Sequence, residues 1–134
     1  MSPNLSIEAC RKTLLRINKL CSPDGTVVLV GDFNLPAIDW STMSSPLDAK
    51  NVDFLNLCST FGLTQYVTES TRHCNILDLV LSNDHMLISD CTVGVPFGLS
   101  DHNSVEFSIF IELNSSKTLK APEVRLVTNW SNAN

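Results

Sequence analysis

The segment Val27-Val-Leu-Val-Gly-Asp-Phe-Asn34 indicates more about the architecture of this chain than any other. Its apolar, mostly β-branched residues predict a buried strand, and Gly31 allows the backbone to turn where that strand ends. Asp32 and Asn34 are then expected at the carboxyl end of a strand, where α/β proteins commonly place their chemistry. We therefore predict an α/β fold with a polar site at this strand end.

A second acid and an imidazole come from Ser100-Asp-His102, which follows the turn-like Pro96-Phe-Gly-Leu99 and precedes the last expected strand. Taken alone, the Asp-His pair fits either the polarity of a loop or a functional site. A preceding strand that ends in Gly-Asp-Phe-Asn favours the functional interpretation. Two strand ends rich in Asp, Asn and His are what metal-assisted hydrolysis of a phosphate ester requires.

Asp78 is a third candidate, because it interrupts the apolar run Ile76-Leu-Asp-Leu-Val-Leu81. A carboxylate within an apolar strand is costly unless it is hydrogen-bonded or paired. Two interpretations stay open: Asp78 faces solvent at a sheet edge, or it orients an imidazole by accepting its N–H.

Length and composition describe an ordinary globular chain of at most one domain, with 134 residues, 43% hydrophobic and 17% charged. No apolar run approaches the roughly 20 residues that cross a bilayer, and the first residues lack the basic and apolar regions of a secretory signal. We expect an intracellular protein without a membrane partner. The net charge of −5 weighs against a nucleic-acid coat protein, which needs a basic stripe, but it does not exclude a nuclease with metal-binding carboxylates.

The cysteines predict neither a zinc finger nor a disulfide framework, because their number is odd and no C-x-x-C pair occurs. They are Cys10, Cys21, Cys58, Cys74 and Cys91. Cys10 and Cys58 fall on apolar helical faces, and Cys74 lies beside His73 in a polar loop where no further ligands converge.

Periodicity predicts a helix over residues 6–21, where apolar residues recur at spacings of 3, 4, 3 and 4, and a second helix near 48–61 that stops at Gly62. Further strands are expected at 64–68, 76–82, 88–95 and 104–113. The last strand alternates, with Val105, Phe107, Ile109, Ile111 and Leu113 on one face. Phe110 on the opposite face indicates that this face is covered too. We assign residues 1–113 to the domain and 114–134 to a polar linker.

Three segments in this order, Gly31-Asp-Phe-Asn34, Leu77-Asp-Leu-Val-Leu-Ser82 and Ser100-Asp-His102, resemble the endonuclease/exonuclease/phosphatase superfamily. They resemble in particular the apurinic-like endonuclease domain of non-LTR retrotransposons. Thr71-Arg72 ahead of Asn75-Ile-Leu-Asp78, and Gly98-Leu-Ser-Asp-His-Asn103, are typical of that branch. The resemblance covers about residues 5–113, and residues 124–134 faintly resemble the connector toward a reverse transcriptase.

The resemblance implies a Mg²⁺-dependent (or Mn²⁺-dependent) endonuclease that nicks DNA for target-primed reverse transcription. In that role Asp32 activates the attacking water, and Asn34 helps to hold this water or the phosphate. Asp101 contributes to the metal site, while His102 meets the scissile phosphate or shares in proton transfer and Asp78 fixes its tautomer. The implied partner is the reverse transcriptase region of the same polyprotein, in the nucleus for the full-length element.

The chain also departs from the family pattern, which is a four-layer sandwich whose amino-terminal half supplies a metal-binding Asn and Glu and often a Tyr. Here only 30 residues precede Gly31, and the sole tyrosine, Tyr66, lies downstream of it. We therefore expect a partial four-layer α/β sandwich with its amino-terminal half missing. Such a chain exposes an apolar sheet face, holds Mg²⁺ poorly and nicks DNA little or not at all by itself.

Other functions stay open beside this one. The chain is alternatively a catalytically dead remnant or an interaction module, or another superfamily member such as a phosphoinositide phosphatase or a repair apurinic endonuclease. The loops and the carboxyl-terminal extension look more like the mobile-element branch than the repair enzymes. Arg72 fits either a phosphate contact or a surface ion pair.

Overall fold

The computed structural model describes residues 7–21 and 25–111 of the chain. The expected linker at 114–134, the connector-like residues 124–134, the end of the strand expected at 104–113 and the side chain of Cys10 lie outside the described residues. Neither described helix has the length and apolar character that spanning a bilayer requires.

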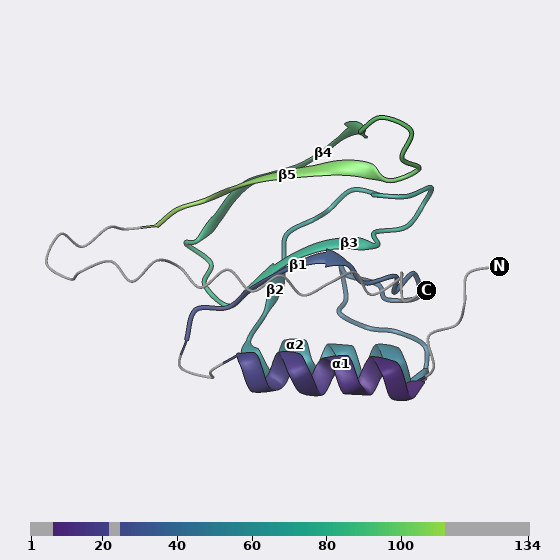
Figure 1. Ribbon diagram of the computed structural model, residues 1–134, viewed down its shortest axis with the longest axis vertical. Coiled ribbons are helices and arrows are strands. Elements are labelled where there is room, and N and C mark those ends of the chain that lie inside the picture. Colours follow the sequence, from purple (N-terminus) through teal and green to yellow (C-terminus); the bar gives the residue numbers. More distant parts are fainter. Residues whose placement is uncertain (1–6, 22–24, 112–134) are drawn as a thin grey trace, which may run out of the picture.

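The described elements stack in three layers (Figure 1). Helices α1 (Ile7–Leu20) and α2 (Ala49–Phe61) form the first layer. The second is an antiparallel sheet in the order β1 (Val28–Asp32), β3 (Asp78–Ser82) and β2 (Thr64–Gln65), and the third is the antiparallel pair β4 (Ile88–Pro96) and β5 (Asn103–Ile109). A mixed α/β fold is thereby confirmed. The expected fold is part of a four-layer sandwich, and the described residues form three layers.

Helix α2 begins and ends where its capping residues predict. The side chain of Asp48 accepts a hydrogen bond from the backbone N–H of Lys50, which satisfies one of the free donors of the first turn. At the other end Gly62 adopts φ 62°, a left-handed conformation that costs glycine little. The helix predicted over 48–61 is therefore confirmed to within one residue.

Strand β3 is buried on both faces, and this explains its continuous apolar run. Leu79 and Leu81 face the helices, where they pack in a cluster that includes Phe54. Val80 faces the other way and packs with Val67 under the β4–β5 layer. A strand covered on both sides needs apolar residues at consecutive positions rather than at alternate ones.

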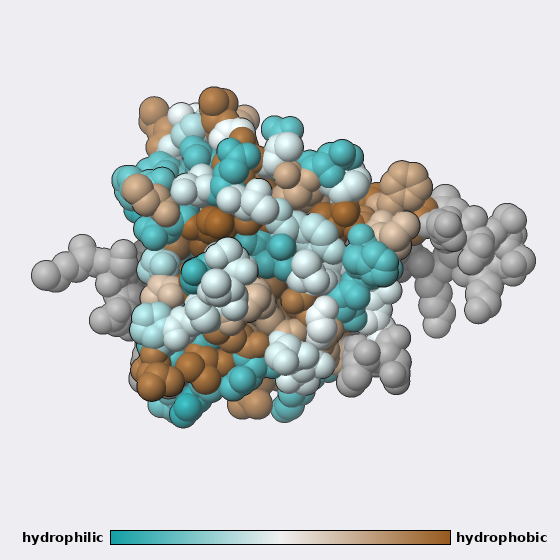
Figure 2. All heavy atoms as spheres, turned by 180° about the vertical axis from the view of Figure 1, so that it is seen from behind, coloured by the Kyte–Doolittle hydropathy of each residue, from teal (hydrophilic) through white to brown (hydrophobic). Residues whose placement is uncertain are grey.

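The outer layer is less covered than its sequence predicts. Val105 and Phe107 pack on the second cluster, but Ile109 and Ile111 of the same predicted face are 48% and 62% exposed. Phe110 is 73% exposed, so the expectation that its face is covered is wrong for the described residues. Figure 2 shows apolar atoms on the surface of this layer among hydrophilic ones. Phe110 is exposed because none of the described helices or strands lies on the outer side of β5.

Candidate functional site

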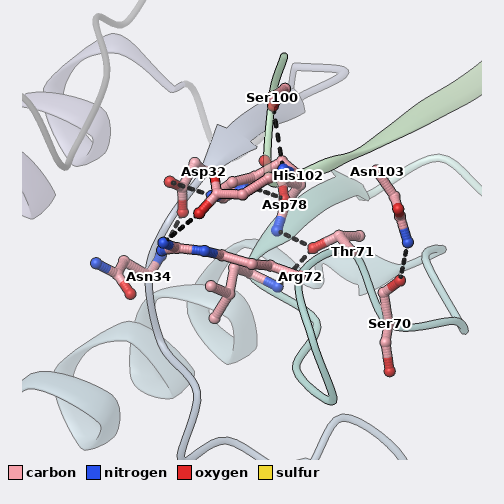
Figure 3. Close-up of polar contacts among 11 residues, drawn as sticks. Asp32, Asn34, Ser70, Thr71, Arg72, Asp78, Ser100, His102 and Asn103 are labelled. Atoms are coloured by element: carbon pink, nitrogen blue, oxygen red, sulfur yellow. Dashed lines mark hydrogen bonds and ion pairs between the residues drawn. The ribbon is translucent and has the colours of Figure 1, made fainter. Parts of the chain in front are cut away.

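The ends of three strands meet at one rim of the molecule (Figure 3). Strand β1 ends at Asp32 and β3 begins at Asp78, and the antiparallel register pairs these two residues directly. Strand β5 begins at Asn103, so the preceding His102 reaches the same rim. The structure thereby brings together three of the five side chains that the sequence singled out.

His102 lies between the two carboxylates. Its Nδ1 is 2.7 Å from Oδ2 of Asp78, and its Nε2 is 4.0 Å from Oδ2 of Asp32. Because an ionised carboxylate only accepts hydrogen bonds, this contact favours the tautomer of His102 that carries its proton on Nδ1. Of the two interpretations of Asp78, the structure supports the one in which it orients an imidazole. The three side chains are each 19–24% exposed to solvent, so a substrate has access to them.

Thr71 holds the backbone of this rim in place, a role that sequence reasoning did not assign. Its side chain is fully buried, and its Oγ1 accepts hydrogen bonds from the N–H groups of Leu77 (3.0 Å) and Asp78 (3.1 Å). Its carbonyl accepts the N–H of Asn103 at 2.7 Å, which ties the start of β5 to the start of β3. The only sequence signal was its place in the Thr71-Arg72 pair.

Asn34 contributes its backbone rather than its side chain. Its φ of 49° is left-handed, so the chain turns here and not at Gly31 as expected, since β1 continues through Gly31 to Asp32. The N–H of Asn34 donates to Oδ1 of Asp32 at 2.9 Å, and its carbonyl accepts a hydrogen bond from Lys50. Its side-chain amide points away from the imidazole (Figure 3). The local turn therefore orients the carboxylate of Asp32.

Asp101 stays outside the cluster. Its side chain is 59% exposed, and its carboxylate pairs with Nη2 of Arg72 at 2.5 Å. This hydrogen bond lowers the pKa of the Asp101 carboxyl below its ordinary value. Of the two interpretations of Arg72, the structure shows the ion pair.

The cluster fits a divalent cation in its donor set. One oxygen each of Asp32 and Asp78 and one nitrogen of His102 lie within 4.8 Å of one another. Magnesium is commonly bound by one or two carboxylates, with water and substrate phosphate completing an octahedral shell. Asp101 does not belong to this group, so its predicted part in metal binding stays a prediction.

A cleft of about 160 Å³ opens beside the cluster, between the two sheets. It is lined by Val30, Gly31, Asp78, Leu79, Val80, Asn103, Val105 and Phe107. Pockets that enclose a small ligand usually have about 300–1,000 Å³. The cleft is therefore too small to enclose a ligand of nucleotide size, and a larger ligand would have to lie across the rim.

Comparison with protein families matches the family described as endonuclease-reverse transcriptase over residues 1–106. The matched residues include all three motif segments and the whole three-residue cluster. Comparisons with curated proteins and with solved structures gave no match. The resemblance inferred from the three motifs is confirmed.

Proposed function

The chain belongs to the endonuclease-reverse transcriptase family, and from this we propose that the rim of Asp32, Asp78 and His102 hydrolyses phosphodiester bonds of DNA with the help of a divalent cation. One observation carries the proposal: a single imidazole is hydrogen-bonded to Asp78 on one side and faces Asp32 on the other. This arrangement combines an oriented proton-transfer group with a second carboxylate at a solvent-accessible edge.

In this proposal each member of the cluster has its own role. Asp78 fixes the tautomer of His102, so Nε2 is the nitrogen that exchanges a proton with the phosphate or the leaving oxygen. The 4.0 Å between Nε2 and Asp32 is too long for a hydrogen bond, yet one water oxygen can contact both atoms. The role we propose for Asp32 is to accept a proton from the attacking water, and this distance is consistent with it.

The resemblance gives the cation to Asp101, whose carboxylate would have to leave Arg72 to join the donor atoms of Asp32, Asp78 and His102. When bound, Mg²⁺ or Mn²⁺ would offset the negative charge that develops on the phosphate. The side chain of Asn34, expected to hold the water or the phosphate, would have to turn toward the rim. Because Asp101 and Asn34 stand outside the cluster, we expect slow hydrolysis.

Nicking of supercoiled plasmid with protein in molar excess tests the proposal. We expect slow, EDTA-sensitive nicking that falls by about 10²–10⁴ in His102→Ala, the usual contribution of general acid–base catalysis. Asp78→Asn should lose part of this activity, because an amide does not enforce the same tautomer. His85→Ala is the matched control, since His85 is exposed in a loop away from the cluster. Equal nicking by the His102 and His85 variants would contradict the proposal.

The biological substrate we propose is chromosomal DNA nicked for target-primed reverse transcription by a non-LTR retrotransposon protein in the nucleus. The family description couples an endonuclease with a reverse transcriptase, which supports this reading. Parallel assays on a duplex with an abasic site and on phosphoinositide micelles separate the alternatives. Preference for the abasic duplex would favour a repair enzyme, and phosphate release from the lipid would favour a phosphatase.

A second candidate, an interaction module without catalysis, is favoured by the apolar outer layer. Several large apolar side chains of this layer are exposed, among them Val95 (82%) and Phe110 (73%), and exposed apolar surface can mark a contact with a protein. Such a surface suits a protein partner. Concentration-dependent association in sedimentation, together with nicking that does not depend on His102, would favour this candidate over the enzyme.

A further inference from the structure

Arg72 is held beside the cluster by its backbone. Its N–H donates to the carbonyl of Asn75 at 3.1 Å, and the N–H of Asn75 donates back at 2.9 Å. The preceding residue is Thr71, which anchors both β3 and β5. Figure 3 shows the Arg72 side chain passing beneath the Asp78–His102 pair. The position of this arginine relative to the rim is therefore well defined.

The guanidinium has hydrogen-bonding capacity that the protein does not use. Arginine presents five N–H donors in a planar fork. Nη2 donates to Asp101, while Nε is buried and has no partner. The side chain as a whole is still 34% exposed. An ion pair whose carboxylate is mostly exposed adds little to stability, so stability alone does not explain this placement.

The negative charges at the rim make a positively charged side chain necessary for binding an anionic substrate. Three carboxylates, Asp32, Asp78 and Asp101, would repel a phosphodiester anion. Of the arginines in the described residues, Arg72 lies at the rim, and the other two, Arg11 and Arg16, lie on α1 in the opposite layer. A planar guanidinium binds two phosphate oxygens at once, which lysine does not do.

We propose that Arg72 forms a phosphate-binding site for the nucleic acid strand next to the cleavage position. In the free protein, Asp101 holds the guanidinium of Arg72 in place by their ion pair. The inference rests on the proposed function, which it extends by a substrate contact. It requires that Arg72 touches the phosphate itself and does not act only by positioning Asp101.

The test is the salt dependence of binding to a fluorescent DNA duplex in the His102→Ala background, which prevents cleavage. Each phosphate contact contributes about 0.9 to the slope of log K against log salt on B-DNA. Arg72→Ala should therefore lower the magnitude of the slope by about 0.9 and weaken binding by roughly tenfold or more. Arg11→Ala is the matched control, because it removes the same charge from an exposed ion pair with Asp53 and should leave the slope unchanged.

Two further variants separate direct contact from positioning. Asp101→Asn keeps the arginine and removes a negative charge, so it should retain the slope and bind as tightly or more tightly. Arg72→Lys keeps the charge but loses the fork, so it should weaken binding with little change in slope, and it replaces the alanine variant should that one fail to fold.

Several results would overturn the inference. These are an Arg72→Ala slope equal to that of Arg11→Ala, an Asp101→Asn variant that loses the same slope, or undiminished affinity in Arg72→Lys. If the parent binds DNA and nicks it through His102 while any of these holds, only the inference fails. If the parent protein binds no duplex at any salt concentration, the proposed function fails with it.

Discussion

Replacing Thr71 with valine removes one hydroxyl oxygen that serves two backbone donors, while the side chain keeps nearly the same shape. That oxygen accepts the N–H groups of Leu77 and Asp78 at 3.0 and 3.1 Å, and Thr71 itself is 0% exposed. The variant therefore tests whether the start of β3, and with it the position of the Asp78 carboxylate, depends on this single hydroxyl.

The expected loss follows from the number of donors left without a partner. An unsatisfied buried donor costs about 1–3 kcal/mol. The hydrogen bond from the N–H of Leu77 is buried, so its loss should cost this free energy in full. The hydrogen bond from the N–H of Asp78 is only partly buried, so water can replace the lost acceptor and reduce the cost. We expect a decrease of about 2–4 kcal/mol in the free energy of unfolding, a large part of the 5–15 kcal/mol typical of a domain.

Urea denaturation followed by circular dichroism measures this loss, with Thr71→Ser as the control that keeps the hydroxyl and loses one methyl group. The serine variant should lose about 1 kcal/mol. With a slope of about 2 kcal/mol per molar urea, the middle of the usual range, the midpoint of the valine variant should fall by about 1–2 M. A valine variant as stable as the serine variant would refute the reasoning, because the hydroxyl would then not satisfy the two donors.

Three further outcomes follow from individual contacts. The hydrogen bond from Arg72 lowers the pKa of the Asp101 carboxyl. The stabilisation by this pair is therefore complete above the unfolded-state pKa of Asp101 and is lost as the pH falls through its lower folded-state pKa. In an NMR titration, Arg72→Ala should return the titration midpoint of Asp101 to its ordinary value. Burial raises the pKa of the Cys58 thiol to about 12, so a maleimide should label the exposed Cys74 in the native protein and Cys58 only after unfolding, as mass spectrometry of the labelled peptides would show. Gly62→Ala should cost about 1–2 kcal/mol in chemical denaturation, because φ is 62° there and the added Cβ would meet no neighbour, so the backbone conformation alone carries the penalty.

Elements with strong local signals could be predicted from the amino-acid order. Helix α2 lies where Asp48 and Gly62 cap an apolar periodicity, and β1 lies where a β-branched run ends in Gly31-Asp32. The family could also be predicted from the sequence, because three short motifs in a fixed order are more specific together than any one of them alone. Such features depend on residues that are close in the sequence, so they can be read from the sequence directly.

The partners of the polar side chains depend on contacts between distant residues. Asp78 meets His102 because Thr71 ties the start of β5 to the start of β3, and the register of β1 with β3 brings Asp32 to the same rim. By contrast, Asp101 sits next to His102 in the chain and yet turns to Arg72.

The same distinction explains the outer layer. Alternation correctly identified one face of the strand that begins at Asn103, but not how much of that face is covered. Periodicity reports which side chains share a face, since that follows from backbone geometry alone. The burial of a side chain and the partner of a polar group depend on a second surface at a particular distance. Those contacts contribute free energy only after the layers have packed.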